Sequence, residues 1–170
     1  MVVKVSYTRK AKPAKANVGY IEHRPGKDGA KIIRTLFNAD GKMERIQAYQ
    51  MIDQAEEGSI FFRIIISPDP QKEDTNRDLS LREITEKTMH VIEDKFQKHI
   101  QWVAAEHIET DNRHTHVLAI VPGGLYSQDL QLIRTRATEE ALQQRRERDL
   151  IQEQRERTQQ HKEKEAEWEY

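Results

Sequence analysis

The sequence predicts an α+β domain followed by a charged helix, and three observations predict it. Residues 59–70, "SIFFRIIISPDP", form an apolar, β-branched run closed by two prolines, as is typical of a strand. Residues 79–100 place apolar side chains near a 3.6-residue period, which predicts a long amphipathic helix. Residues 136–170 consist largely of Glu, Gln, Arg and Lys, which predicts a solvated helix. We expect a domain over 1–135 and a helical extension over 136–170.

The N-terminal elements follow from local composition. Residues 1–8, "MVVKVSYT", alternate and are β-branched, so they predict a strand. The Lys-, Ala- and Pro-rich residues 9–19 are expected to form a connection. The "PGKDG" of residues 25–29 predicts a turn.

The next segment contains shorter elements. Residues 31–38 fit either a strand or a short helix, and the "ADGK" of residues 39–42 predicts a turn. Residues 43–58 have helical spacing and end at Gly58, which favours a helix.

A β-hairpin is expected near residue 110. Residues 100–109 and 113–122 both predict strands. The "TDNR" between them is a tight connection, because Asp and Asn favour turns. The two strands are therefore expected to pair antiparallel.

Composition limits the functional classes. The chain has 170 residues, with 34% charged and 36% hydrophobic residues and no cysteine. Disulfides and thiolate metal sites are excluded. No apolar run reaches ~18 residues, so no membrane span is expected. The N-terminus lacks the apolar core of a secretion signal. We therefore expect a cytoplasmic protein.

Positive charge is concentrated at the N-terminus. Residues 1–34 contain nine Lys or Arg and two acids, a net charge of +7 in a chain whose net charge is −1. Such a segment can neutralise phosphates and release their counterions. A disordered basic arm has the same composition. Tyr7 and Tyr20, which lie within the segment, favour a nucleic-acid surface.

Three histidines of the hairpin predict a metal site. His114 and His116 are two positions apart on one strand, so both rings point to one face. His107 lies near the end of the preceding strand and can face the same side across the hairpin. Three imidazoles in one place suit a divalent cation. Asp111 and Glu109 are close enough in sequence to orient a ring.

A site with three histidine ligands leaves positions open on the metal. Such a site can polarise a phosphoryl or carbonyl oxygen, or generate a hydroxide. The basic segment favours a phosphate substrate. Tyr20 lies in that segment and could act as a nucleophile, provided its phenolate is favoured.

The histidine segment resembles a known motif. "HIETDNRHTH" resembles the metal motif of the HUH-type plasmid relaxases, nicking enzymes of conjugation, with His107, Thr110, Asp111, Asn112, His114 and His116 in register. Upstream, "NVGYIEHRPG" resembles the family's nucleophile motif, in which a Tyr-Ile pair follows a short helix. Three segments, "LFNADGKM", "FFRIIISPDP" and "IQWVAAEH", follow in the order found in mobilization and T-DNA border-cleaving relaxases. The resemblance covers about residues 15–135.

The resemblance implies a central antiparallel sheet, with the two histidine strands in its middle and helices packed on it. It implies that Tyr20 attacks a phosphodiester of single-stranded DNA and leaves a 5′-phosphotyrosyl link and a free 3′-OH. Mg²⁺ or Mn²⁺ on the three histidines would polarise the phosphate, and Asp111 would orient a histidine. Six residues would hold the DNA backbone, namely Arg9, Lys10, Lys12, Lys15, Arg24 and Lys27.

The partners implied are single-stranded DNA at an origin-of-transfer-like site and accessory proteins that the C-terminal helix would recruit. The sequence departs from the family pattern at Thr115, where a hydrophobic residue is usual, and at Ile120, where an Asn is frequent. The chain is also shorter than most relaxases.

Three alternatives stay open. A replication initiator or small transposase of the same fold would use a downstream tyrosine, and Tyr126 is the candidate. A non-catalytic DNA-binding accessory factor would bind DNA without cleaving it. A metal-dependent hydrolase of small phosphoesters would need no basic segment.

Overall fold

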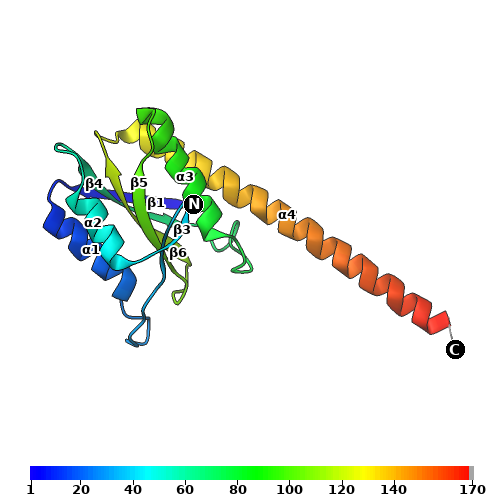
Figure 1. The fold of residues 1–170 in the computed structure, drawn as a ribbon. Coiled ribbons are helices and arrows are strands. Elements are labelled where there is room, and N and C mark those ends of the chain that lie inside the picture. The colour runs from blue at the N-terminus through cyan, green and yellow to red at the C-terminus, as the bar shows by residue number, and fades with distance from the viewer. Residues whose placement is uncertain (169–170) are drawn as a thin grey trace.

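The computed structural model describes residues 1–168, which form a mixed α+β domain with a long projecting helix (Figure 1). This architecture confirms the predicted fold class. In chain order the elements are β1 (Val2–Thr8), α1 (Ala11–His23), β2 (Leu36–Asn38), β3 (Gly41–Met43), α2 (Arg45–Asp53), β4 (Ile60–Ser67), α3 (Leu81–Phe96), β5 (Gln101–His107), β6 (His114–Val121) and α4 (Ser127–Trp168).

The six strands form one sheet in the order β1-β4-β6-β5-β2-β3, and every neighbouring pair is antiparallel. The hairpin strands β5 and β6 occupy the middle, as the family resemblance implies. β4 and β6 are covered on both sides, so they are apolar almost throughout rather than alternating with polar residues.

Helices cover both faces of the sheet and give it two cores. On one face, α1 and α2 pack on residues such as Phe61 and Leu118. On the other face, α3 and the first part of α4 pack on residues such as Phe62 and Ile64. Burying an apolar side chain of this size contributes about 1.5–3 kcal/mol, so each core is a substantial stabilising term.

Helix α1 lies where the sequence predicted a connection. Ala14, Val18 and Ile21 are buried, and their spacing of four and three residues gives the helix one apolar face. Pro13 is its third residue, where the missing N–H would have had no partner within the helix. The prediction was wrong because the stripe is only one residue wide and lies within a Lys-rich segment.

Most of the remaining elements are close to the prediction but shorter at their ends, whereas β3 (Gly41–Met43) forms a strand where the sequence predicted a turn and the start of a helix. Only Leu36–Asn38 of the ambiguous 31–38 segment forms a strand, and it joins the sheet by pairing Phe37 with Ala104. Helix α3 begins after Ser80, whose side chain accepts a hydrogen bond from the backbone N–H of Glu83. It ends at Gln97, which has the left-handed φ of 51° typical of a helix terminus.

Helix α4 runs without interruption from Ser127 through the predicted domain boundary at residue 135. Its buried residues continue as far as Arg145, and the part beyond projects from the sheet (Figure 1). Within residues 1–168, no helix combines the length and the apolar character needed to cross a bilayer.

Candidate metal centre

The hairpin brings the three predicted histidines together. His107 ends β5 and pairs with His114, the first residue of β6, while His116 pairs with Ala105. Residues two apart on a strand share a face, so His114 and His116 point to the same side as His107. The ring centroids are 4.2 to 5.2 Å apart. The predicted convergence of the rings is therefore confirmed.

Backbone carbonyls fix the orientation of two rings. The carbonyl of Ile21 lies 3.0 Å from Nε2 of His107, and the carbonyl of Asn112 lies 2.8 Å from Nδ1 of His114. A carbonyl oxygen only accepts, so those two nitrogens carry the protons. The unprotonated nitrogens are therefore Nδ1 of His107 and Nε2 of His114.

The unprotonated nitrogens fit a metal ion. Nδ1 of His107 is buried and has no hydrogen-bond partner within residues 1–168. Nε2 of His114 lies 3.1 Å from Nε2 of His116, and one nitrogen from each of the three rings lies within 4.8 Å of the others. Two nitrogens bound to one ion at about 2.1 Å lie roughly 3.0–3.4 Å apart. The cluster could hold a metal ion that supplies the partner His107 lacks.

Burial keeps these imidazoles neutral. Desolvation lowers the pKa of His107 to about 3, and the positive charge of Arg34 acts in the same direction. Desolvation also lowers the pKa of His116 to about 3, followed by the effect of His107. The pKa of His114 is lowered too, again mainly by burial. Neutral imidazole is the form that binds metals, so the rings are ready to do so near neutral pH.

The two acids of the hairpin contact cations and not histidines. Asp111 is exposed and pairs with Lys27 at 2.8 Å, and Glu109 accepts a hydrogen bond from Arg34 at 3.1 Å. Within residues 1–168, no hydrogen bond joins either acid to a histidine of the cluster. The structure therefore does not bring Asp111 together with the rings that it was expected to orient. The carbonyls of Ile21 and Asn112 occupy those positions instead.

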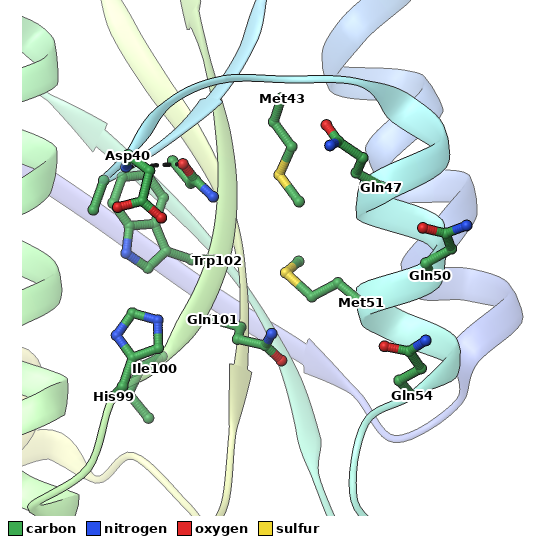
Figure 2. A pocket seen from close by; sticks show the side chains of 12 residues that line it. Asp40, Met43, Gln47, Gln50, Met51, Gln54, His99, Ile100, Gln101 and Trp102 are labelled. Atoms are coloured by element: carbon green, nitrogen blue, oxygen red, sulfur yellow. Dashed lines mark hydrogen bonds between the residues drawn. The ribbon is translucent and has the colours of Figure 1, made fainter.

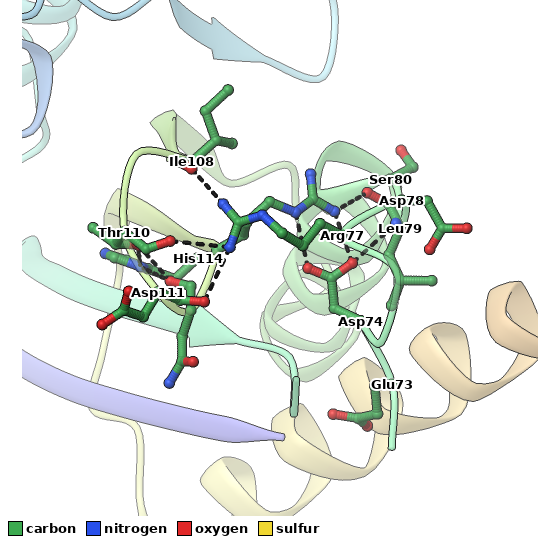
Figure 3. Close-up of polar contacts among 12 residues, drawn as sticks. Glu73, Asp74, Arg77, Asp78, Leu79, Ser80, Ile108, Thr110, Asp111 and His114 are labelled. Atoms are coloured by element: carbon green, nitrogen blue, oxygen red, sulfur yellow. Dashed lines mark hydrogen bonds and ion pairs between the residues drawn. The ribbon is translucent and has the colours of Figure 1, made fainter. Parts of the chain in front are cut away.

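A second loop holds the hairpin turn in place (Figure 3). The guanidinium of Arg77 donates to the carbonyls of Ile108, Thr110 and Asp111 at 2.6 to 3.1 Å. Nearby, Arg113 forms an ion pair of 2.8 Å with the buried Asp74. Sequence reasoning missed Arg77, which lies in a loop and has a left-handed φ of 53°. The only feature of the sequence that pointed to Arg77 was a positive charge in a segment rich in turn-forming residues.

Helix α1 places Tyr20 beside the cluster. The ring of Tyr20 is 48% exposed, and its centroid lies 6.2 Å from that of His116. The guanidinium of Arg24 lies 5.6 Å from the Tyr20 centroid. The predicted nucleophile and the predicted metal ligands are therefore neighbours, although they are more than 85 residues apart in sequence.

Tyr126 lies elsewhere. It follows β6, whose first residues carry the histidines and whose last residue is Val121. His116 and Val121 are five residues apart, or roughly 17 Å along a strand. The Tyr126 ring is exposed, and the Lys95 ammonium lies 4.7 Å from its centroid.

The six predicted DNA-binding residues are spread over the connection between β1 and α1, over α1 itself and over the loop that follows. Arg9, Lys10 and Lys12 are exposed near the start of α1. Lys15 forms an ion pair with Asp53, and Lys27 forms one with Asp111. Among the six, only Arg24 lines the groove that contains Tyr20 and His116.

That groove has a volume of about 360 Å³ and lies between α1 and the sheet. Its cations are Arg24 and two residues that sequence reasoning missed, Lys4 of β1 and Arg63 of β4. No acidic residue is among those that line it within residues 1–168. Arg63 did leave a signal, since it is the only charge in the apolar strand "IFFRIIIS".

A different hollow of about 340 Å³ lies near the opposite end of β5 (Figure 2). It is lined by the thioethers of Met43 and Met51, by Trp102, and by several amide side chains, including those of Gln47 and Gln50. Within residues 1–168, the histidine triad is the one group of three or more His, Asp or Glu residues close enough together to hold a metal ion.

Comparisons of the chain with protein-family models, with curated proteins and with solved structures found no match. A functional proposal therefore depends on the chemistry of the described residues and on the motif resemblance.

Proposed function

We propose that the protein nicks single-stranded DNA by a relaxase-like transesterification during the transfer of a plasmid or another mobile element, in the cytoplasm. The observation that carries the proposal is the position of Tyr20, which shares one cation-lined groove with His116. A phenol beside three neutral imidazoles combines a nucleophile with a site for a Lewis acid. A cation-lined groove suits a phosphodiester substrate.

The chemistry assigned to Tyr20 conserves the bond energy of the DNA. The Tyr20 hydroxyl loses its proton and its Oη forms a bond to phosphorus, while the bond from phosphorus to the 3′ oxygen breaks. The 3′ oxygen takes up a proton and leaves as a free 3′-OH. The DNA 5′ end stays attached as a phosphotyrosine, and the reverse reaction rejoins the strand without ATP.

His107, His114 and His116 are the residues that would hold a divalent cation in this proposal. Mn²⁺ or Mg²⁺ at this position would supply Lewis-acid stabilisation of the charge that develops on the phosphate. Mg²⁺ prefers oxygen ligands, whereas neutral imidazoles are common ligands of first-row transition metals. Arg24 adds positive charge beside the Tyr20 ring, where the phosphate must approach.

The position of Tyr126 favours this function over a replication initiator or transposase. A nucleophile must reach a phosphate held at the histidines, and Tyr126 follows the far end of β6. Tyr20 needs no rearrangement of the sheet to reach the groove, because α1 already forms its wall.

The test is to incubate the protein and Mn²⁺ or Mg²⁺ with labelled single-stranded DNA from the region that flanks its gene. We expect a covalent adduct on a denaturing gel. Tyr20→Phe removes the attacking oxygen but keeps the half-exposed ring, so this variant should fold, bind DNA and form no adduct. Tyr126→Phe is the matched control and should form the adduct.

Two outcomes would contradict the proposal. A phosphotyrosyl peptide containing Tyr126 would assign the protein to the initiator or transposase class. A parent protein that binds DNA and metal but forms no adduct with any of these oligonucleotides would be a non-catalytic DNA-binding factor.

A further inference from the structure

Arg63 is a cation in a position where strands normally carry apolar residues. It lies in the middle of β4, where it pairs with Ser6 on one side and with Leu118 on the other. Its Nε is buried and has no hydrogen-bond partner within residues 1–168. A buried N–H donor without a hydrogen-bond partner destabilises the folded state, and more so when the group is charged. The folded protein therefore holds Arg63 at a cost in stability.

Two other arginines near the metal cluster, Arg34 and Arg113, have acidic partners. Arg34 donates to Glu109, and Arg113 pairs with Asp74. No carboxylate lines the groove around Arg63 among the described residues. The positive charge of Arg63 therefore lacks the neutralisation that the chain provides for Arg34 and Arg113.

The register of the sheet aims Arg63 at the same space as the metal cluster. Arg63 and Ile65 share a face of β4, and Ile65 pairs with His116 on one side and with Lys4 on the other. Arg63 thus lies two residues, or about 7 Å along the strand, from Ile65, the residue of β4 that pairs with His116. Lys4, Arg24 and Arg63 then surround the groove beside Tyr20.

We propose that Arg63 binds a backbone phosphate of single-stranded nucleic acid on the floor of the groove, flanked by Lys4 and Arg24. The proposal rests on the DNA-directed function above and specifies where the strand lies. A guanidinium offers several N–H donors in a planar fork, which matches two phosphate oxygens. A bound phosphate would supply the acceptor that Nε lacks. Arg63 is then a substrate-positioning residue whose Nε has no hydrogen-bond partner among residues 1–168 of the free protein.

The test measures DNA binding rather than cleavage. Parent and variants, all carrying Tyr20→Phe and kept free of divalent metal, are titrated with a fluorescein-labelled single-stranded oligonucleotide at several salt concentrations. Arg63→Gln should weaken binding about tenfold or more, since it removes a charged hydrogen bond. It should also reduce the magnitude of the slope of log K against log salt by about 0.7, the contribution of one phosphate contact.

Two matched variants test whether binding depends on the charge at residue 63, on the planar shape of the guanidinium, or on where a cation lies on the surface. Arg63→Lys keeps the charge but not the fork, so its salt slope should match the parent while its affinity falls. Lys87→Gln removes an exposed cation from α3, which covers the other face of the sheet, and it should change neither quantity. Inorganic phosphate, titrated as a competitor, shows whether the groove takes the anion alone or requires the strand.

Thermal unfolding distinguishes substrate binding from a structural role. If Arg63 stabilised the fold, Arg63→Gln would lower Tm. We expect an unchanged or higher Tm, because the variant removes a charge that has no partner. Equal affinity and equal salt slope in Arg63→Gln and the parent would overturn the inference. Failure of the protein that retains Tyr20 to form an adduct in the presence of Mn²⁺ or Mg²⁺, with binding still dependent on Arg63, would overturn the nicking proposal alone.

Discussion

At the scale of single residues, the histidine cluster depends on which nitrogen of each ring is free. The carbonyl of Ile21 lies 86 residues from His107 in sequence and engages its Nε2, which leaves the buried Nδ1 as the unprotonated nitrogen. The backbone carbonyl of Asn112, two residues before His114, likewise accepts a hydrogen bond from Nδ1 of His114. Because a second hydrogen bond fixes the tautomer, these carbonyls determine that the lone pairs converge.

Metal binding should depend on the two strand histidines. The double variant His114→Ala/His116→Ala removes two of three ligands, so Mn²⁺ should no longer raise its Tm. For the parent, a ligand at one hundred times its Kd adds about 2.7 kcal/mol to the free energy of unfolding. His90→Ala, at an exposed position on α3, is the control. Equal Mn²⁺-induced shifts in the double variant and the parent would show that the ion binds elsewhere.

The buried histidines should make the metal-free protein acid-sensitive. His107 and His116 have a pKa of about 3 when folded, below the ordinary value of 6.5. Between these values the unfolded chain binds protons that the folded chain does not. The contribution of these histidines to the free energy of unfolding should therefore fall below pH 6.5, by up to about 1.4 kcal/mol per pH unit for each histidine, and level off near pH 3.

Urea titrations at a series of pH values in a chelator would measure this dependence. His107→Gln/His116→Gln should have a shallower slope between pH 6.5 and pH 3 than the parent. His161→Gln, at an exposed position on α4, should keep the parental slope. A double variant with the parental slope would mean that other groups cause the acid sensitivity.

At the scale of elements, the β5–β6 hairpin is held in place by contacts with residues that lie outside the hairpin. Arg77 binds three carbonyls of the turn, and Arg113 ties the base of the turn to Asp74 and to the carbonyl of Leu79. The loop between β4 and α3 thus braces the turn that presents His114. Lys27 adds an exposed link to Asp111, which we expect to contribute little.

Removing the Arg77 guanidinium should loosen the metal site without removing a ligand. Arg77→Asn suits this test, because Asn tolerates the left-handed backbone that Arg77 adopts. We expect metal affinity to fall about tenfold or more, the usual effect of losing a group that positions a ligand. Isothermal titration with Mn²⁺ measures it, with Arg134→Gln on α4 as the control. Unchanged affinity in Arg77→Asn would mean that the turn holds its shape without the clamp.

At the scale of the whole molecule, α4 has two parts with different surroundings. Residues up to Arg145 pack on the domain, where Gln144 accepts a hydrogen bond from the Ser80 backbone N–H at 2.7 Å and Arg145 pairs with Asp78 at 2.7 Å. Beyond Asp149 the side chains are exposed as far as Trp168, and pairs such as Gln152 with Glu156 join positions four apart on the helix itself.

Two truncations should therefore behave differently. A chain that stops after Gln152 keeps every contact of α4 with the domain, so its Tm should stay within about 2 °C of the parent. A chain that stops after Gln143 loses the contacts with Ser80 and Asp78. Its Tm should fall by several degrees, because about 1 kcal/mol corresponds to roughly 2–4 °C in a protein of this size. Calorimetry measures both, and equal Tm values would show that Gln144 and Arg145 do not stabilise the domain.

Although it left β2 ambiguous and missed β3, the sequence by itself determined the four longer strands β1, β4, β5 and β6, the β5–β6 hairpin and the three histidines. These features depend on patterns within a few residues, such as alternation along a strand and the i, i+2 spacing of His114 and His116. It also indicated that residues 136–170 form a charged helix. It misplaced α1, because an apolar stripe of three residues in a Lys-rich segment resembles a basic connection.

Only the tertiary structure decided what surrounds the histidines. It places the Ile21 carbonyl on His107, Tyr20 beside His116, and Lys4, Arg24 and Arg63 around one groove. It also pairs the carboxylate of Asp111 with the ammonium of Lys27 and not with a histidine. These contacts join residues that are far apart in the chain. They depend on strand order and helix packing, which local residue patterns do not specify.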